Sequence, residues 1–184
     1  MLITFPGTTI EALHIQKGAS RVLFDGIFAT GGITLSQVSV MTGLEPYMIQ
    51  NWVKRGFVSS PKNRIYSKEQ FARIAIINML REAIQIDRIC SLIEAIVDVI
   101  DDTCDKLKGD DDLYHLYVDM ITDGNININN DNSITKAAVR ATEEITEKEA
   151  NAKQQLIKIL KIMTYAHTAS QLKALGNEIF STLS

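Results

Sequence analysis

Residues 34–58 read TLSQVSVMTGLEPYMIQNWVKRGFV, and the spacing of apolar residues in this stretch decides the fold. Its first part repeats apolar side chains three residues apart, at Leu35, Val38 and Met41. Gly43 follows, and glycine suits the left-handed backbone position that commonly ends a helix. The pattern predicts a helix of about two turns that stops at a tight turn.

A second helix is predicted over residues 46–55. Pro46 fits its first turn because the fixed φ of proline is already helical and a first-turn N–H has no helical partner. The buried stripe then falls at i, i+3 and i+4, on Ile49, Trp52 and Val53, and Gly56 ends the helix. The two segments together predict a helix-turn-helix.

The next stretch, residues 57–66, reads FVSSPKNRIY. Two short β-prone pieces flank a Pro and Asn turn, which predicts a small β-hairpin with a wing over residues 60–66. Ser67 and Gln70 have the spacing of a capping box, so a further helix is expected from there to about residue 84. Its inward positions are expected to be Phe71, Ile74, Ala75, Ile77 (or Asn78) and Leu80.

With its apolar stripe inside, the helix over residues 46–55 turns four side chains outward: Tyr47, Gln50, Asn51 and Lys54. Amide side chains such as Gln50 and Asn51 pair with adenine through two hydrogen bonds. Tyr47 can donate to a phosphate or stack on a sugar. These positions predict a recognition helix in the major groove of DNA, while the alternative is a set of solvated polar residues.

Further contacts are expected with the DNA phosphates. They come from the basic side chains Lys54, Arg55, Lys62 and Arg64, each adding to a salt-dependent affinity. Thr34 or Ser36 is expected to cap the first helix and to lend backbone N–H groups to another phosphate. For Tyr66, packing at the base of the wing and contact with a phosphate are equally open.

Charge is distributed unevenly along the chain, although its net charge is only −3. Residues 34–93 carry 8 basic and 4 acidic side chains, whereas residues 94–150 carry 5 basic and 15 acidic ones. A basic head beside an acidic body suits a protein that touches a polyanion with one end. An uneven solvated surface explains the same distribution equally well.

In order and spacing, this part of the chain resembles the head of MerR-like winged helix-turn-helix regulators. The matching positions are Thr42-Gly43, Pro46, Ile49, Trp52, Gly56, Phe57, Val58, Arg64 and Tyr66. Over residues 34 to about 120 the chain is more similar to an uncharacterised bacterial family, described only as a domain of unknown function with a MerR-like head. The motifs QNWVKRG (50–56) and YSKEQFAR (66–73) carry this similarity.

The resemblance implies a DNA-binding transcriptional regulator and names neither its operator nor its effector. Many MerR-like heads carry Arg-Tyr-Tyr-Glu in the recognition helix, where this chain has Gln-Asn-Trp-Val at residues 50–53. The usual arginine and tyrosine contacts therefore do not carry over. The rival expectation is a protein-interaction adaptor that keeps the winged-helix shape without a specific DNA site.

The expected fold class is mainly α, with a winged helix-turn-helix domain over residues 33–93 and an acidic helical region over residues 94–184. Residues 1–32 are expected to form a helical lead-in, over residues 10–28, and a linker. The acidic region is expected to serve dimerisation or the binding of an unknown effector or protein partner.

Four helices are expected in and before the acidic region: from near Asp87 to about Lys108-Gly109, then over residues 110–121, 133–166 and 170–183. The first half of the helix over 133–166 buries alanines such as Ala138 and Ala141, which permits close helix approach and suggests either a packing seam or a homodimer seam. The last helix is expected to fold back onto the bundle.

No catalytic or metal-binding pattern is visible, and we expect neither an enzyme nor a cofactor. His14, His115 and His167 are far apart among unrelated neighbours. Residues 123–131 alternate oxygen ligands but lack the glycine and glutamate of a calcium loop. A Gly-rich phosphate loop and a Ser-His-Asp set are also missing from the sequence.

Cys90 and Cys104 lie in apolar surroundings without a CxxC spacing, so they are interpreted as reduced structural thiols. No apolar run reaches the roughly 18 residues that span a bilayer. The N-terminus has no pattern of a signal peptide. These features predict a cytoplasmic protein without membrane contact.

Overall fold

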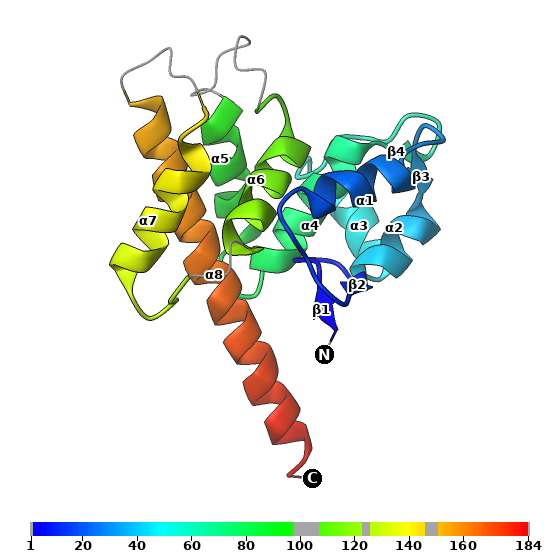
Figure 1. Cartoon of the computed structure of the whole chain (residues 1–184). Coiled ribbons are helices and arrows are strands. Elements are labelled where there is room, and N and C mark those ends of the chain that lie inside the picture. The colour runs from blue at the N-terminus through cyan, green and yellow to red at the C-terminus, as the bar shows by residue number, and fades with distance from the viewer. Residues whose placement is uncertain (1, 98–106, 123–125, 146–150, 184) are drawn as a thin grey trace.

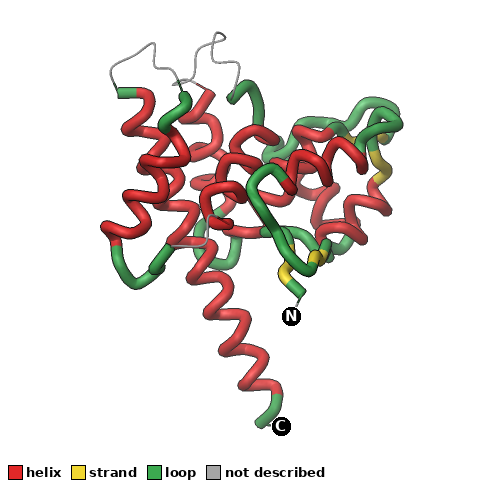
Figure 2. The backbone as a smooth tube through the Cα atoms, in the orientation of Figure 1, coloured by secondary structure: helices red, strands yellow, loops and turns green. Residues whose placement is uncertain are grey.

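The computed structural model describes residues 2–97, 107–122, 126–145 and 151–183 (Figure 1). Helices dominate this part of the chain, and its strands are only two residues long (Figure 2). The elements in chain order are β1 (Ile3–Thr4), β2 (Glu11–Ala12), α1 (Ala19–Ile27), β3 (Ile33–Thr34), α2 (Leu35–Thr42), α3 (Pro46–Lys54), β4 (Ile65–Tyr66), α4 (Lys68–Leu80), α5 (Ile86–Val97), α6 (Asp110–Thr122), α7 (Asp131–Thr142) and α8 (Ala152–Ser181). The expected class, mainly α with small β elements, is confirmed.

Helices α2 and α3 form where the sequence predicts them, with a tight turn between them. Gly43 has a φ of 69°, in the left-handed region, and its N–H donates to the carbonyl oxygen of Ser39 at 2.9 Å. The hydroxyl of Ser39 donates to the carbonyl oxygen of Leu44 at 2.6 Å. Leu44 is buried in the hydrophobic core, so side-chain packing stabilises the turn in addition to these hydrogen bonds.

The two halves of the hairpin predicted over residues 57–66 do not pair with each other. β4 pairs antiparallel with β3, so that Tyr66 lies opposite Ile33 and Ile65 opposite Thr34. Residues 57–58 form no strand, and their side chains are buried in the core instead. The local pattern shows only the turn, because the pairing strand lies about thirty residues upstream and is itself too short to have a periodicity.

α4 is the central helix and is buried on nearly every side. Its predicted capping box is present, because the Ser67 hydroxyl accepts from the Gln70 N–H and the Gln70 side chain accepts from the Ser67 N–H. The helix ends at Leu80, before the expected residue 84. Besides the expected inward positions, Ala72, Ile76 and Met79 are buried, since α4 contacts α2, α5, α6 and α8.

The helical lead-in expected over residues 10–28 is wrong in its first half. That half contains β2, which pairs antiparallel with the preceding strand β1, and α1 starts only at residue 19. Phe24 of α1 is fully buried, with its ring centroid 5.2 Å from that of Phe71 and 5.1 Å from that of Tyr114. The N-terminal segment therefore packs against both α4 and α6.

The long helix expected over residues 133–166 is interrupted, and the expected last helix is not separate. α7 ends at Thr142, and α8 runs without a break from residue 152 to residue 181. The sequence around residues 166–170, AHTAS, contains no Gly or Pro that would end a helix. α8 therefore does not fold back, and its C-terminal part projects from the body of the molecule (Figure 1).

The alanine stripe of α7 is covered within the chain. Ala137 and Ala138 are buried, and α7 packs against α6 and α8. Small side chains allow this close approach, as expected, but the partner helices belong to the same chain. The homodimer seam predicted on this stripe is therefore occupied intramolecularly.

Two expectations fall partly outside the described residues. α5 starts at residue 86 and buries Ile89, Ile93 and Ile96 as expected, but its predicted course through residues 98–106, with Cys104, lies outside them. In the asparagine-rich loop, residues 123–125 also lie outside, and the described residues 126–130 form a turn and no strand.

Candidate nucleic-acid interface

The buried side of α3 sets the orientation of its exposed side. Ile49 and Trp52 are buried and Val53 is half-buried, as the sequence predicts. Gly56, with a φ of 79°, then reverses the chain, and the N–H of Phe57 donates to the carbonyl oxygen of Trp52 at 2.9 Å. These contacts hold α3 on the core along its buried side and at its C-terminal end.

The opposite face of α3 is polar and exposed. Tyr47, Gln50, Asn51 and Lys54 all lie in solvent, and Tyr47 is 68% exposed. Within the part of the chain that the structure describes, none of these four side chains makes a hydrogen bond or an ion pair. The structure thus brings the predicted recognition residues together on one unobstructed face.

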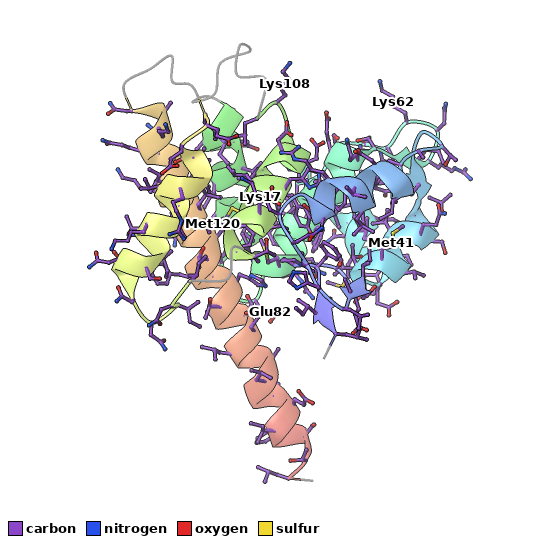
Figure 3. All side chains as sticks on the ribbon, viewed as in Figure 1. Lys17, Met41, Lys62, Glu82, Lys108 and Met120 are labelled. Carbon is purple, nitrogen blue, oxygen red and sulfur yellow. The ribbon has the colours of Figure 1, made fainter. Side chains whose placement is uncertain are left out.

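A tight turn forms the tip of the segment predicted as a wing. Its two central residues, Asn63 and Arg64, have φ values of 51° and 65°, and the N–H of Ile65 donates to the carbonyl oxygen of Lys62 at 2.9 Å. This is the geometry of a two-residue hairpin turn with left-handed residues at both centres. Lys62 and Arg64 are exposed, and Figure 3 shows Lys62 projecting away from the body.

The start of α2 is capped by Thr34 and not by Ser36. The Thr34 hydroxyl accepts from the Gln37 N–H at 3.4 Å, and the Gln37 side chain accepts from the Thr34 N–H at 2.8 Å. Thr34 and Ser36 are both exposed. The N-terminal end of α2 therefore faces solvent, as a phosphate contact requires.

Arg55 and Tyr66 differ from the other predicted contact residues. The guanidinium carbon of Arg55 lies 4.4 Å from the centroid of the Phe57 ring, so this charge rests on an aromatic face. Tyr66 is only 3% exposed, and burial raises the pKa of its hydroxyl. Of the two roles left open for Tyr66, its burial favours packing at the base of the wing.

Several other cations of the head are neutralised by acidic side chains. Arg73 pairs with Asp110 at 3.1 Å and with Glu94 at 3.3 Å, and Lys68 lies 3.7 Å from Asp111. Burial raises the pKa of Asp110, against the opposing effect of Arg73. The sequence alone does not predict these ion pairs, because they join residues far apart along the chain.

By contrast, Lys54, Lys62 and Arg64 form no ion pair in the described structure, and all three are exposed. They lie at the end of α3 and at the tip of the neighbouring turn. An unpaired cation keeps its full charge for a ligand, whereas a paired one must first lose its partner. Helix α3 and the tight turn thus each present a cation whose charge no acidic side chain of the described structure neutralises.

A support of this face, Asn78, was not recognised from the sequence. Its side-chain amide donates to the carbonyl oxygens of Gly7, at 3.1 Å, and Thr42, at 2.9 Å. Thr9 anchors the same helix end, since its N–H donates to Met41 and its hydroxyl to Val40. The sequence shows only that a polar amide interrupts the apolar stretch of α4. The carbonyl groups to which this amide donates come from distant segments, so only the tertiary structure identifies them.

Two of the clefts in the described structure border α6, and the sequence does not predict them. A polar cleft of about 980 Å³ separates the turn from α4 and α6 and includes Lys62 and Arg73 in its walls. A smaller cleft of about 500 Å³ lies between α1, α6 and α7, and Lys17 and Met120 are among its lining residues (Figure 3). Both have mixed charge, and neither singles out a ligand.

Among the described residues, no group of three or more His, Cys, Asp or Glu side chains is arranged to hold a metal ion. In the same part of the chain, no helix combines the length and the apolar character needed to cross a membrane.

Comparison with known proteins finds one family whose model matches the head and the helices that follow it. Residues 32–119 match the model of a family described as "Domain of unknown function (DUF1836)". The match spans the exposed face of α3, the tight turn and the packed helices α4 to α6, slightly less than half of the chain. No curated protein and no solved structure matches the chain.

Proposed function

We propose that this protein is a sequence-specific DNA-binding transcriptional regulator with a MerR-like winged helix-turn-helix head. In this proposal α3 enters the major groove of double-stranded DNA, and the wing over residues 60–66 contacts the flanking phosphates. The observation that carries it is the exposed, unpartnered polar face of α3 beside the unpaired cations Lys54, Lys62 and Arg64.

Each part of the surface has a role in this arrangement. Gln50 and Asn51 offer amide donors and acceptors that match the major-groove edge of adenine. Lys54, Lys62 and Arg64 supply salt-dependent phosphate contacts, which also steer the approach to DNA. The exposed N-terminus of α2 at Thr34 and Ser36 adds backbone N–H groups for one more phosphate.

The test is the selection of bound duplexes from a random DNA pool, at two salt concentrations, with the purified protein. We expect one enriched sequence at both concentrations. A triple variant, Gln50→Ala, Asn51→Ala and Lys54→Ala, should lose that preference, because it removes the amides that read bases and one phosphate contact. Each bidentate contact of this kind favours the correct base over a wrong one by roughly 1–3 kcal/mol.

The control is a triple variant on another helix that also removes two amide groups and one ammonium group. Gln154, Gln155 and Lys158 of α8 are exposed, so their replacement by alanine removes the same chemical groups away from the head. This control should keep the sequence preference of the wild type. An unchanged preference in the α3 variant would refute the proposed recognition helix.

The adaptor remains the second candidate, because α2 and α3 of the head each expose a large apolar side chain. Val40 of α2 is 72% exposed and Tyr47 of α3 is 68% exposed. Apolar surface at this place suits a protein partner. Weak DNA binding that selects no sequence and disappears at the higher salt concentration would favour the adaptor.

A further inference from the structure

The projecting part of α8 carries large apolar side chains in solvent. Leu172 is 62% exposed, Ile179 66% and Phe180 74%, and Leu183, two residues beyond the end of the helix, is 78% exposed. Beyond the ion pair of Lys173 with Glu82, at 2.9 Å, this stretch extends past the other described elements, and these four side chains stay largely exposed (Figure 1). Moving apolar side chains of this size out of water is favourable, so they favour a partner that covers them.

The spacing of the exposed residues shows what kind of partner fits. Alternating steps of three and four residues separate Ile162, Tyr165, Ala169, Leu172, Gly176, Ile179 and Leu183, which we call the α8 seam. All seven are exposed. A repeat of 3.5 residues stays in register with a second helix in a left-handed coiled coil. The α8 seam therefore fits another helix.

Small and large residues alternate along the α8 seam. Ala169 and Gly176 are small, whereas Tyr165, Leu172 and Ile179 are large. The space beside Gly176 is open, since a Cβ added there would have no atom within 4 Å. A matching partner must therefore place large side chains opposite the small ones.

A second copy of the same helix meets this requirement in one orientation. In a parallel pair each position faces itself, so Gly176 would face glycine and leave a gap. In an antiparallel pair the alternate seam positions face each other, which sets Gly176 opposite Leu172 and Ala169 opposite Ile179. Tyr165 then faces Leu183, and the interface is self-complementary, as a two-fold dimer requires.

Charge and area are consistent with self-association. Between residues 162 and 183 the charged side chains are Lys173 and Glu178, of opposite sign, so no net charge opposes pairing. The five large apolar side chains of the α8 seam and the exposed Leu175 and Phe180 beside it make seven. At roughly 100 Å² of exposed surface each, one copy offers on the order of 700 Å², near the roughly 800 Å² per partner of a stable interface.

We propose that two copies of this chain pair through the α8 seam as an antiparallel coiled coil. The pairing is independent of the proposed function, because it uses none of the residues assigned to DNA contact. It also differs from the dimer seam expected on the alanine stripe, which is buried within the chain.

Sedimentation equilibrium of the full chain tests the pairing. We expect a dimer at micromolar concentrations, and a double variant, Leu172→Glu and Ile179→Glu, should weaken dimerisation by roughly a hundredfold or more by burying unpaired charges. Both side chains are exposed in the monomer, so circular dichroism should show an intact fold. Val22→Glu is the matched control, since Val22 is 75% exposed on α1 and should leave the dimer unchanged.

Cross-linking tests the orientation. One preparation carries Ala169→Cys and the other Ile179→Cys, and peptide mapping separates their products from any bond to the native cysteines. Oxidation of the mixture should give a disulfide between positions 169 and 179, whereas each preparation alone should give little self-linked product. A monomeric wild type, a dimer that survives both glutamates, or self-linked Ala169→Cys would each overturn the proposal.

Discussion

Asn78 links three separate segments of the chain through one side chain. Its amide group donates to Gly7 in the N-terminal segment and to Thr42 at the end of α2, and its oxygen accepts from the Nε of Arg81 at 3.1 Å. Because α3 follows α2 after a tight turn, this residue helps to position the candidate recognition helix without belonging to its surface.

Replacing Asn78 with alanine should lower the free energy of unfolding by about 1–3 kcal/mol, because two carbonyl groups lose their donors in a mostly buried place. Urea unfolding of the full chain measures the change. Asn129→Ala is the control, since this side chain is exposed in the loop before α7 and makes no hydrogen bond among the described residues. An equal effect of both variants would contradict the anchoring role.

At the scale of elements, the tight turn after residue 61 combines strain with charge. Asn63 and Arg64 both occupy the left-handed region, which costs energy for residues other than glycine. In the proposed function this strain is retained because Arg64 contacts a phosphate from the tip of the wing.

The variant Arg64→Gly should therefore separate stability from binding. We expect its free energy of unfolding to rise by up to about 1 kcal/mol, since glycine adopts the same φ without strain. Its DNA affinity should fall, and the slope of log affinity against log salt should decrease in magnitude by about 1. Lys136→Ala on α7 removes an exposed cation elsewhere and should keep the wild-type slope; the same slope for Arg64→Gly would place the turn away from DNA.

The whole molecule is joined by one continuous hydrophobic core across the described residues. This core includes Phe24 of α1, Phe71 of α4, Tyr114 of α6 and Leu160 of α8. Two histidines lie within or beside it: Nδ1 of His115 is 2.8 Å from the Ser20 hydroxyl, and Nδ1 of His167 is 3.0 Å from the Tyr117 hydroxyl. Helices on both sides of residue 93 thus stabilise one another.

The histidines make the stability of this core depend on pH. Burial lowers the pKa of His115 from 6.5 to about 4, and burial has the same effect on His167. The unfolded chain binds these protons first as pH falls. Their contribution to stability is therefore complete above pH 6.5 and is lost as the pH falls toward about 4.

We expect His115→Gln to make the unfolding free energy fall less steeply over this pH range, because one of the two buried imidazoles is removed. Urea unfolding at a series of pH values gives the slope, and His14→Gln, at an exposed position, serves as the control. A slope equal to that of the wild type in His115→Gln would show that this histidine does not resist protonation in the folded state.

The sequence by itself determined the elements whose signals are local. Gly43 and Pro46 delimit the turn between α2 and α3, Ser67 and Gln70 start α4, and Ile49 with Trp52 separates the buried from the exposed face of α3. Capping hydrogen bonds and helical periodicity act over a few residues, so they can be read along the chain.

Only the tertiary structure decided which strands, side chains and charges contact one another across the chain. The partner of β4 is β3, the N-terminal segment anchors α2 through Asn78, and the acidic start of α6 neutralises cations of α4. α8 remains one helix because no residue between its two halves breaks it. Its second half is exposed because the hydrophobic core contains no residue of α8 beyond Ala166. These contacts join residues that are far apart in sequence, so the pattern within a short segment does not identify the partner.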